Sequence, residues 1–194
     1  MTYNDYDWSI VPLEPVPLTM GHINLLNLAR HQADNTLIIL RHHNNSASPK
    51  HLWTQAQSQE MIERWCASQV YVPALKFVQP DAQSSNSDCI ELIQSNTSGK
   101  KVLLTSSLSA CDKFNEYQQN GIDCRFVTPA KDKAGAIIDS STVQHAFLGE
   151  PSLINLQYEL KQCLDLGILH YSTYQWLWRY ALNIQQNTNT RMAS

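Results

Sequence analysis

The sequence lacks the features of a disulfide-rich, secreted or membrane-spanning protein. It has no C-x-x-C pair, and an odd number of cysteines cannot close into a complete set of intrachain disulfides. No run approaches the ~18 apolar residues of a membrane span, and Asp5 and Asp7 stand where a secretory signal needs positive charge. We therefore expect a soluble, cytoplasmic protein with reduced thiols. The cysteines are Cys66, Cys89, Cys111, Cys124 and Cys163.

The chain also lacks an excess of positive charge. Its 14 lysines and arginines stand against 17 aspartates and glutamates, which gives a net charge of −3. No overall basic field is therefore available to attract nucleic acid or an acidic membrane surface, and we expect neither partner. Any site for an anion must be local.

Common metal and phosphate motifs are missing too. The sequence has no H-E-x-x-H motif and no P-loop, because Gly99-Lys100 lacks the upstream glycine of a phosphate cradle. The histidines His42, His43 and His51 have no Cys, Asp or Glu at ligand spacing. We expect no metal bound by protein ligands and interpret this segment as a solvated or substrate-facing loop.

What the sequence does contain is an alternation of short apolar strands with amphipathic helices. The chain has 194 residues, 43% of them hydrophobic, enough for one domain with a core. The continuous run Thr36-Leu37-Ile38-Ile39-Leu40 is typical of a parallel strand covered by helices on both faces. Strands are predicted at residues 8–11, 36–40, 74–78, 101–105 and 124–127, and helices at 23–32, 54–66, 89–93, 112–119, 143–148, 152–165 and 173–185.

This order predicts an α/β fold with a Rossmann-like, doubly wound parallel sheet. We expect a single domain over residues 1–194, with C-terminal helices within 151–185 and disordered ends at 1–7 and 186–194. The C-terminal helices hold more aromatic residues than one helix needs, so we predict core packing and leave self-association into a homo-oligomer open. These residues are Tyr171, Tyr174, Trp176, Trp178 and Tyr180.

The most informative segment follows the first predicted strand. In an open parallel sheet, ligands bind beyond the carboxyl ends of the strands, where the amide groups that open the next helix favour an anion such as phosphate. Gly21 lets the backbone approach a phosphate closely, Thr19 offers a hydroxyl, and the His22 imidazole can donate to developing negative charge. The alternative is that Thr19 and His22 only cap the helix.

Thr19-Met20-Gly21-His22 resembles the T/H-x-G-H signature of the nucleotidyltransferase superfamily, the adenylyl- and cytidylyltransferases. Their second signature, I-S-S-T-x-x-R, has a similar counterpart in the segment from Asp139 to His145. A third segment, from Lys50 through Trp53 to Thr54, resembles the K-N-P-W-T stretch of nicotinamide mononucleotide adenylyltransferases. The resemblance covers most of residues 8–150 and is greatest to the N-terminal domain of bifunctional adenylyltransferase/Nudix proteins.

The resemblance implies an enzyme that transfers AMP from ATP to a pyridine mononucleotide, nicotinamide mononucleotide, and forms NAD and pyrophosphate with Mg²⁺. Its catalytic residues would be His22 and Thr19. Stacking of Trp53 on the nicotinamide ring and neutralisation of a substrate phosphate by Lys50 would bind the acceptor; the alternatives are a core tryptophan and a solvated lysine. The ATP phosphates would be held by Gly21, Ser140, Ser141, Thr142 and His145.

Several positions depart from the family pattern. His145 replaces an arginine or lysine, Gln57-Ser58 replaces an acid and an arginine, and Ser106-Ser107 replaces a Gly-His pair. Each change removes charge or backbone freedom near the nucleotide. Two alternatives therefore stay open: a catalytically degenerate nucleotide-binding or regulatory protein of the same fold, and an enzyme similar to cytidylyltransferases or pantetheine-phosphate adenylyltransferases.

Overall fold

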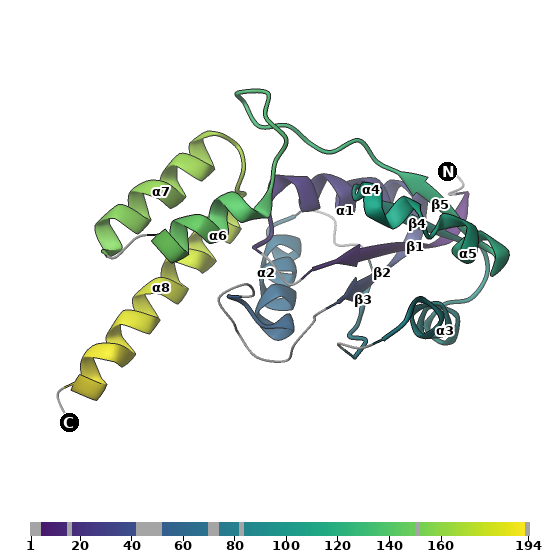
Figure 1. Ribbon diagram of the computed structural model, residues 1–194, viewed down its shortest axis with the longest axis horizontal. Helices are drawn as coiled ribbons and strands as arrows, with labels where there is room; N and C mark the ends of the chain where they lie inside the picture. The colour runs from purple at the N-terminus through teal and green to yellow at the C-terminus, as the bar shows by residue number, and fades with distance from the viewer. Residues whose placement is uncertain are drawn as a thin grey trace.

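The computed structural model describes residues 5–14, 17–41, 52–69, 74–81, 84–149 and 152–192, with side chains described up to residue 186. Five parallel strands form one sheet in the order β3-β2-β1-β4-β5 (Figure 1). The chain moves outward from β1 to β3 and then crosses to β4, so the strand order reverses between β1 and β4. Ligands of open α/β sheets bind at such a reversal. The strands are β1 (Tyr6–Leu13), β2 (Ala33–Leu40), β3 (Ala74–Val78), β4 (Lys101–Thr105) and β5 (Ile122–Phe126).

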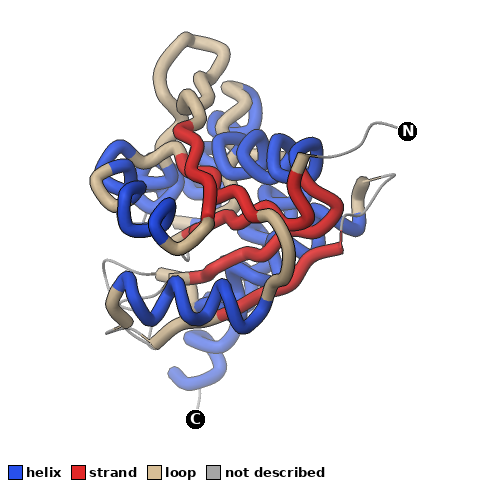
Figure 2. The backbone as a smooth tube through the Cα atoms, turned by 90° about the vertical axis from the view of Figure 1, so that its right-hand side faces the viewer, coloured by secondary structure: helices blue, strands red, loops and turns tan. Residues whose placement is uncertain are grey.

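Helices cover both faces of the sheet (Figure 2), which confirms the doubly wound α/β prediction. Successive residues of β1 serve opposite faces: Val11 belongs to the core cluster that includes residues of α1, α2, α6, α7 and α8, and Ile10 to the cluster that includes residues of α3 and α5. Both side chains are fully buried. The helices are α1 (Met20–Gln32), α2 (Gln55–Ala67), α3 (Asn86–Asn96), α4 (Leu108–Cys111), α5 (Phe114–Gln119), α6 (Ser140–Gly149), α7 (Leu153–Asp165) and α8 (Tyr171–Met192).

The first strand is longer than the sequence predicted. The predicted strand at 8–11 stops before Pro12, a residue that lacks a backbone N–H, yet β1 continues to Leu13, and Pro12 lies opposite Ile39 of β2. The pairing of β1 with β4 covers only Trp8 to Ile10. At Pro12 the strand therefore pairs on one side, which is where a residue without a backbone N–H is tolerated.

The C-terminal helices lie together beyond one end of the sheet (Figure 1) and remain attached to the start of α1. The Met20 N–H donates to the Ile168 carbonyl oxygen at 2.8 Å, and Thr19 forms a bridge with Leu169. Trp176 is buried and stacks on Tyr180 with 5.2 Å between ring centroids, in line with the predicted packing. The backbone of α8 continues to Met192, into the segment 186–194 for which the sequence analysis expects disorder. No described helix is long and apolar enough to cross a membrane.

Candidate functional site

Two segments about 120 residues apart in the sequence meet at the carboxyl edge of the sheet. Thr19, Gly21 and His22 at the start of α1 line a pocket of about 210 Å³ together with Ser140 at the start of α6. Ser106, directly after β4, completes the wall nearest the sheet. The structure thus brings together the first signature and the beginning of the second.

The start of α1 is organised around a contact between Thr19 and His22. The Thr19 backbone N–H donates to His22 Nδ1 at 3.1 Å, and the Thr19 hydroxyl lies 3.1 Å from the same nitrogen. This is a capping box with histidine in the third helical position. Because Nδ1 accepts a hydrogen bond, the neutral ring carries its proton on Nε2, and this nitrogen is its hydrogen-bond donor.

Burial keeps this imidazole neutral. Loss of solvation lowers the pKa of His22 to about 4, although a hydrogen bond to the Pro17 backbone and the nearby Asp139 carboxylate raise it in part. At neutral pH His22 is therefore a hydrogen-bond donor without a full charge. The capping contact and the position beside the pocket are compatible with both roles considered from the sequence, which are helix capping and donation to a phosphate.

Gly21 leaves open space beside the helix start. A Cβ atom at this position would lie 3.5 Å from Thr19 Oγ1 and 3.7 Å from the Ile138 side chain, which are ordinary contacts. The backbone conformation here is one that other residues also adopt. Folding therefore does not require glycine, and the missing side chain enlarges the pocket instead.

A carboxylate stands at the start of α6. Asp139 Oδ1 accepts a hydrogen bond from the Ser141 N–H at 2.8 Å, and Asp139 lines the small pocket beside Ser140. Ser141 and Thr142 are not among the residues that line this pocket. His145 is exposed on α6 and lies outside the lining too. The second signature thus reaches the pocket through its first residues only.

Trp53, one of the two residues expected to bind the acceptor, is not in the lining of either pocket. Trp53 is fully buried, and its ring meets Phe147 of α6 edge-on, with 5.3 Å between centroids. Zero exposure favours the core role over stacking on a ligand. Lys50 lies outside the described residues, as do the three loop histidines. Gln57, a departure from the family pattern, accepts a hydrogen bond from the Thr54 N–H at 2.8 Å and so caps α2.

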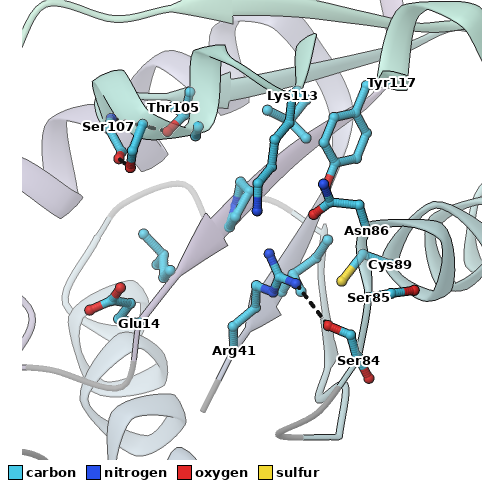
Figure 3. Close-up of a pocket in the computed structure, with 16 residues that line it drawn as sticks. Glu14, Arg41, Ser84, Ser85, Asn86, Cys89, Thr105, Ser107, Lys113 and Tyr117 are labelled. Carbon is cyan, nitrogen blue, oxygen red and sulfur yellow. Dashed lines mark hydrogen bonds between the residues drawn. The ribbon is translucent and has the colours of Figure 1, made fainter. Parts of the chain in front are cut away.

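A larger cavity of about 630 Å³ opens on the other face of the sheet (Figure 3). It lies beyond the carboxyl ends of β1, β2 and β4, with α3, α4 and α5 around it. Its size is within the ordinary range of ligand sites, whereas the small pocket is below it. Charged and polar lining residues include Glu14, Arg41, Ser85, Asn86, Ser107 and Lys113.

Arg41 and Lys113 enter this cavity from opposite sides, and their cationic ends point toward one another (Figure 3). Arg41 Nη2 donates to the Ser84 carbonyl oxygen at 3.2 Å. Among the described residues, ion pairs occur only within α2 and within α7, so neither cation has an acidic partner there.

The sequence analysis missed both residues. Arg41 directly follows a buried parallel strand at the sheet reversal, a position that could have identified it. Lys113 gave no comparable signal.

The short connection after β4 separates the two pockets. Ser106 lines the small pocket, whereas Thr105 and Ser107 line the large cavity. The Ser107 N–H donates to Thr105 Oγ1 at 3.1 Å and fixes the turn. One ligand could therefore bind on each side of the carboxyl end of β4.

Residues 17–133 match the family model described as cytidylyltransferase-like, which is more than half of the chain. The chain belongs to this family. The matched region begins just before Thr19 and includes Arg41 and Lys113, but it ends before Ser140. Its members share the fold predicted from the T/H-x-G-H resemblance, and the expected superfamily is confirmed.

Solved structures of one protein show the same fold. A bifunctional NMN adenylyltransferase/ADP ribose pyrophosphatase from Francisella tularensis, complexed with AMP and a Mn ion, has a TM-score of 0.56 and 14% identity. A second structure of that protein, described without a ligand, gives a TM-score of 0.56 and 13% identity. The matches cover 97% of this chain but only 56% and 57% of those chains. A comparison with curated proteins found no match.

Proposed function

We propose that this cytidylyltransferase-like protein transfers AMP from ATP to the phosphate of a small acceptor. Nicotinamide mononucleotide is the acceptor that the sequence resemblance favours, and the products are NAD and pyrophosphate. One observation carries the proposal: the pocket lined by both signatures and the larger cavity flank the same end of β4. Two substrates can therefore meet at the reversal of strand order.

The reaction requires alignment and charge neutralisation. An oxygen of the acceptor phosphate attacks the α-phosphorus of ATP, the bond to the bridging oxygen of the β-phosphate breaks, and pyrophosphate leaves with that oxygen. The Nε2–H of His22 would donate to an oxygen on which charge develops, and Thr19 would hold the ring in place through Nδ1. Ser140 would contact the outer phosphates.

Mg²⁺ would enter with ATP. No group of three His, Cys, Asp or Glu in the described part of the chain could hold a metal ion, so the phosphates themselves would supply most of its ligands. When bound, the ion supplies neutralisation of phosphate charge. The Francisella structure is complexed with a Mn ion, which supports a divalent ion in this role.

A second candidate function follows from Asp139. Its carboxylate already accepts the Ser141 N–H at the start of α6, where the second signature would hold phosphates. The neighbouring His145 lies outside the pocket lining. This arrangement favours a protein that binds a nucleotide with little or no catalysis.

The two functions are separated by a simple assay. The protein is incubated with ATP, Mg²⁺ and nicotinamide mononucleotide, and pyrophosphate and NAD are measured; CTP and phosphopantetheine replace the substrates in parallel. Pyrophosphate release that requires an acceptor establishes the transferase, and the acceptor that supports it defines the reaction. Binding of ATP without pyrophosphate release in any mixture would instead establish the noncatalytic function.

A further inference from the structure

The larger cavity contains two positive charges with no acidic partner among the described residues. Arg41 projects from the end of β2 and Lys113 from the start of α5, and both point into the same space (Figure 3). Like charges in one cavity repel, and an anion between them removes this cost. Arg41 is held in place by donation to the Ser84 carbonyl oxygen, so its guanidinium is directed toward a ligand before one binds.

The anion is best explained as a phosphate rather than a second carboxylate side chain. Glu14 also lines the cavity, but Figure 3 shows its carboxylate at the opposite side from the two cations. Asn86 is used within the protein, because its side-chain amide donates to Glu116 at 3.1 Å. Arg41 and Lys113 are therefore the cationic groups that the described lining offers to a ligand, and both residue types are common phosphate ligands.

The rest of the wall offers hydroxyl groups rather than aromatic rings. Ser107 and Ser109 line the cavity and lie in contact, with 2.9 Å between their hydroxyl oxygens, whereas the Ser85 hydroxyl caps α3 through Asp88. Tyr117 is the one aromatic residue in the described lining, and only 6% of it is exposed. The described lining can thus form many hydrogen bonds but little stacking.

We propose that this cavity binds a sugar phosphate class of acceptor, with the phosphate between Arg41 and Lys113 and the sugar hydroxyls on the serines. A base attached to the sugar adds little to binding. The acceptor role rests on the proposed function, whereas phosphate binding by the cavity does not.

The proposal is tested by calorimetric titration of the full chain without ATP. The ligands are nicotinamide mononucleotide, ribose 5-phosphate, which lacks the base, and nicotinamide riboside, which lacks the phosphate. We expect ribose 5-phosphate to bind within about threefold of the mononucleotide and the riboside to bind at least about thirtyfold more weakly, because charge-assisted hydrogen bonds dominate. A larger effect of the base than of the phosphate would overturn the proposal.

Variants connect this binding to the two cations. Arg41→Gln and Lys113→Gln should each weaken both phosphorylated ligands by about tenfold or more. Arg41→Lys keeps the positive charge and should retain part of the affinity that the uncharged glutamine loses. Lys100→Gln, at the opposite edge of the sheet beside β4, is the matched control and should bind as the unmodified protein does.

Failure of this inference is distinguishable from failure of the proposed function. Phosphate binding that depends on Arg41 and Lys113, without pyrophosphate release in any assay, would leave the inference intact and remove the transferase. If pyrophosphate is released and the KM for the acceptor is unchanged in both glutamine variants, the transferase function stands and the inference about the cavity is overturned.

Discussion

The backbone N–H of Thr19 donates a hydrogen bond to Nδ1 of His22 over 3.1 Å. This contact satisfies one of the free amides at the start of α1 and at the same time fixes the tautomer of the imidazole. A capping contact and a catalytic orientation are therefore the same interaction. The proton that remains on Nε2 is the one that the neutral ring can donate.

His22→Gln separates these two roles. Glutamine is the ordinary residue at the third position of a capping box, so the helix start should be preserved and the melting temperature should change little. Pyrophosphate release should fall by roughly 10² or more, because the donor to the reacting phosphate is lost. His22→Ala should lose both the activity and about 1 kcal/mol of stability. An active glutamine variant would leave His22 with the capping role alone.

Stability should fall in mild acid. The pKa of His22 is about 4 in the folded protein against an ordinary value of 6.5, so between these pH values the unfolded chain binds a proton that the folded chain does not. The free energy of unfolding should thus be highest above about pH 6.5 and decrease by about 3 kcal/mol or less as the pH falls to about 4. Burial also lowers the pKa of His170, which adds to the same trend.

Urea titrations at several pH values measure this dependence. His22→Gln should reduce the slope and leave the contribution of His170. An unchanged slope in the variant would show that His22 does not titrate as its burial indicates.

Asp139→Asn should improve nucleotide binding. The asparagine oxygen can still accept the Ser141 N–H, but the negative charge that opposes a triphosphate is removed. We expect ATP affinity to rise by roughly fivefold, the size of one weak charge repulsion near a surface, with a small loss of helix stability. Titration of ATP into both proteins at low and high salt checks this, and an affinity gain that persists at high salt would argue against an electrostatic cause.

Gly21→Ala should stabilise the protein while it weakens nucleotide binding. The added methyl group fits the described structure with ordinary contacts, and alanine in a helix is favoured over glycine by about 0.5–1 kcal/mol. The same methyl group projects into the small pocket, so ATP affinity should drop by about tenfold through lost close contacts. Melting curves and titrations decide the matter: unchanged ATP affinity would move the phosphate site away from α1.

Trp53→Ala should destabilise the fold rather than alter one substrate. The side chain is fully buried against Phe147, and removal of such a ring costs about 3–5 kcal/mol of unfolding free energy. Trp53→Phe should cost less, because an aromatic contact with Phe147 can remain. A stable alanine variant with a raised KM for the acceptor alone would restore the stacking role that the sequence suggested.

The sequence predicted the sheet well because its central strands are continuous apolar runs. The run from Thr36 to Leu40 lies within β2, and the predicted strands 74–78 and 101–105 have the observed bounds. Pro12 was misjudged because its cost depends on whether a second strand pairs at that point, which local sequence does not reveal.

The site was predictable only in part, for a related reason. Thr19, Gly21 and His22 lie in one short segment with its own pattern, so their neighbourhood follows from the strand before them and the helix after them. Arg41 and Lys113 are far apart in the sequence and line one cavity only in the folded chain, so no short sequence pattern predicts that they lie together. Trp53 matches a sequence motif, but the match does not tell whether its ring faces a ligand or the core.

The turn after β4 limits how this protein can change over evolutionary time. Thr105, Ser106 and Ser107 face the two pockets alternately, so insertion or deletion of one residue would exchange the side chains presented to each. Loops usually absorb such length changes, but this one would alter both pockets at once. Divergence of the two ligand preferences must therefore proceed by substitution at constant length.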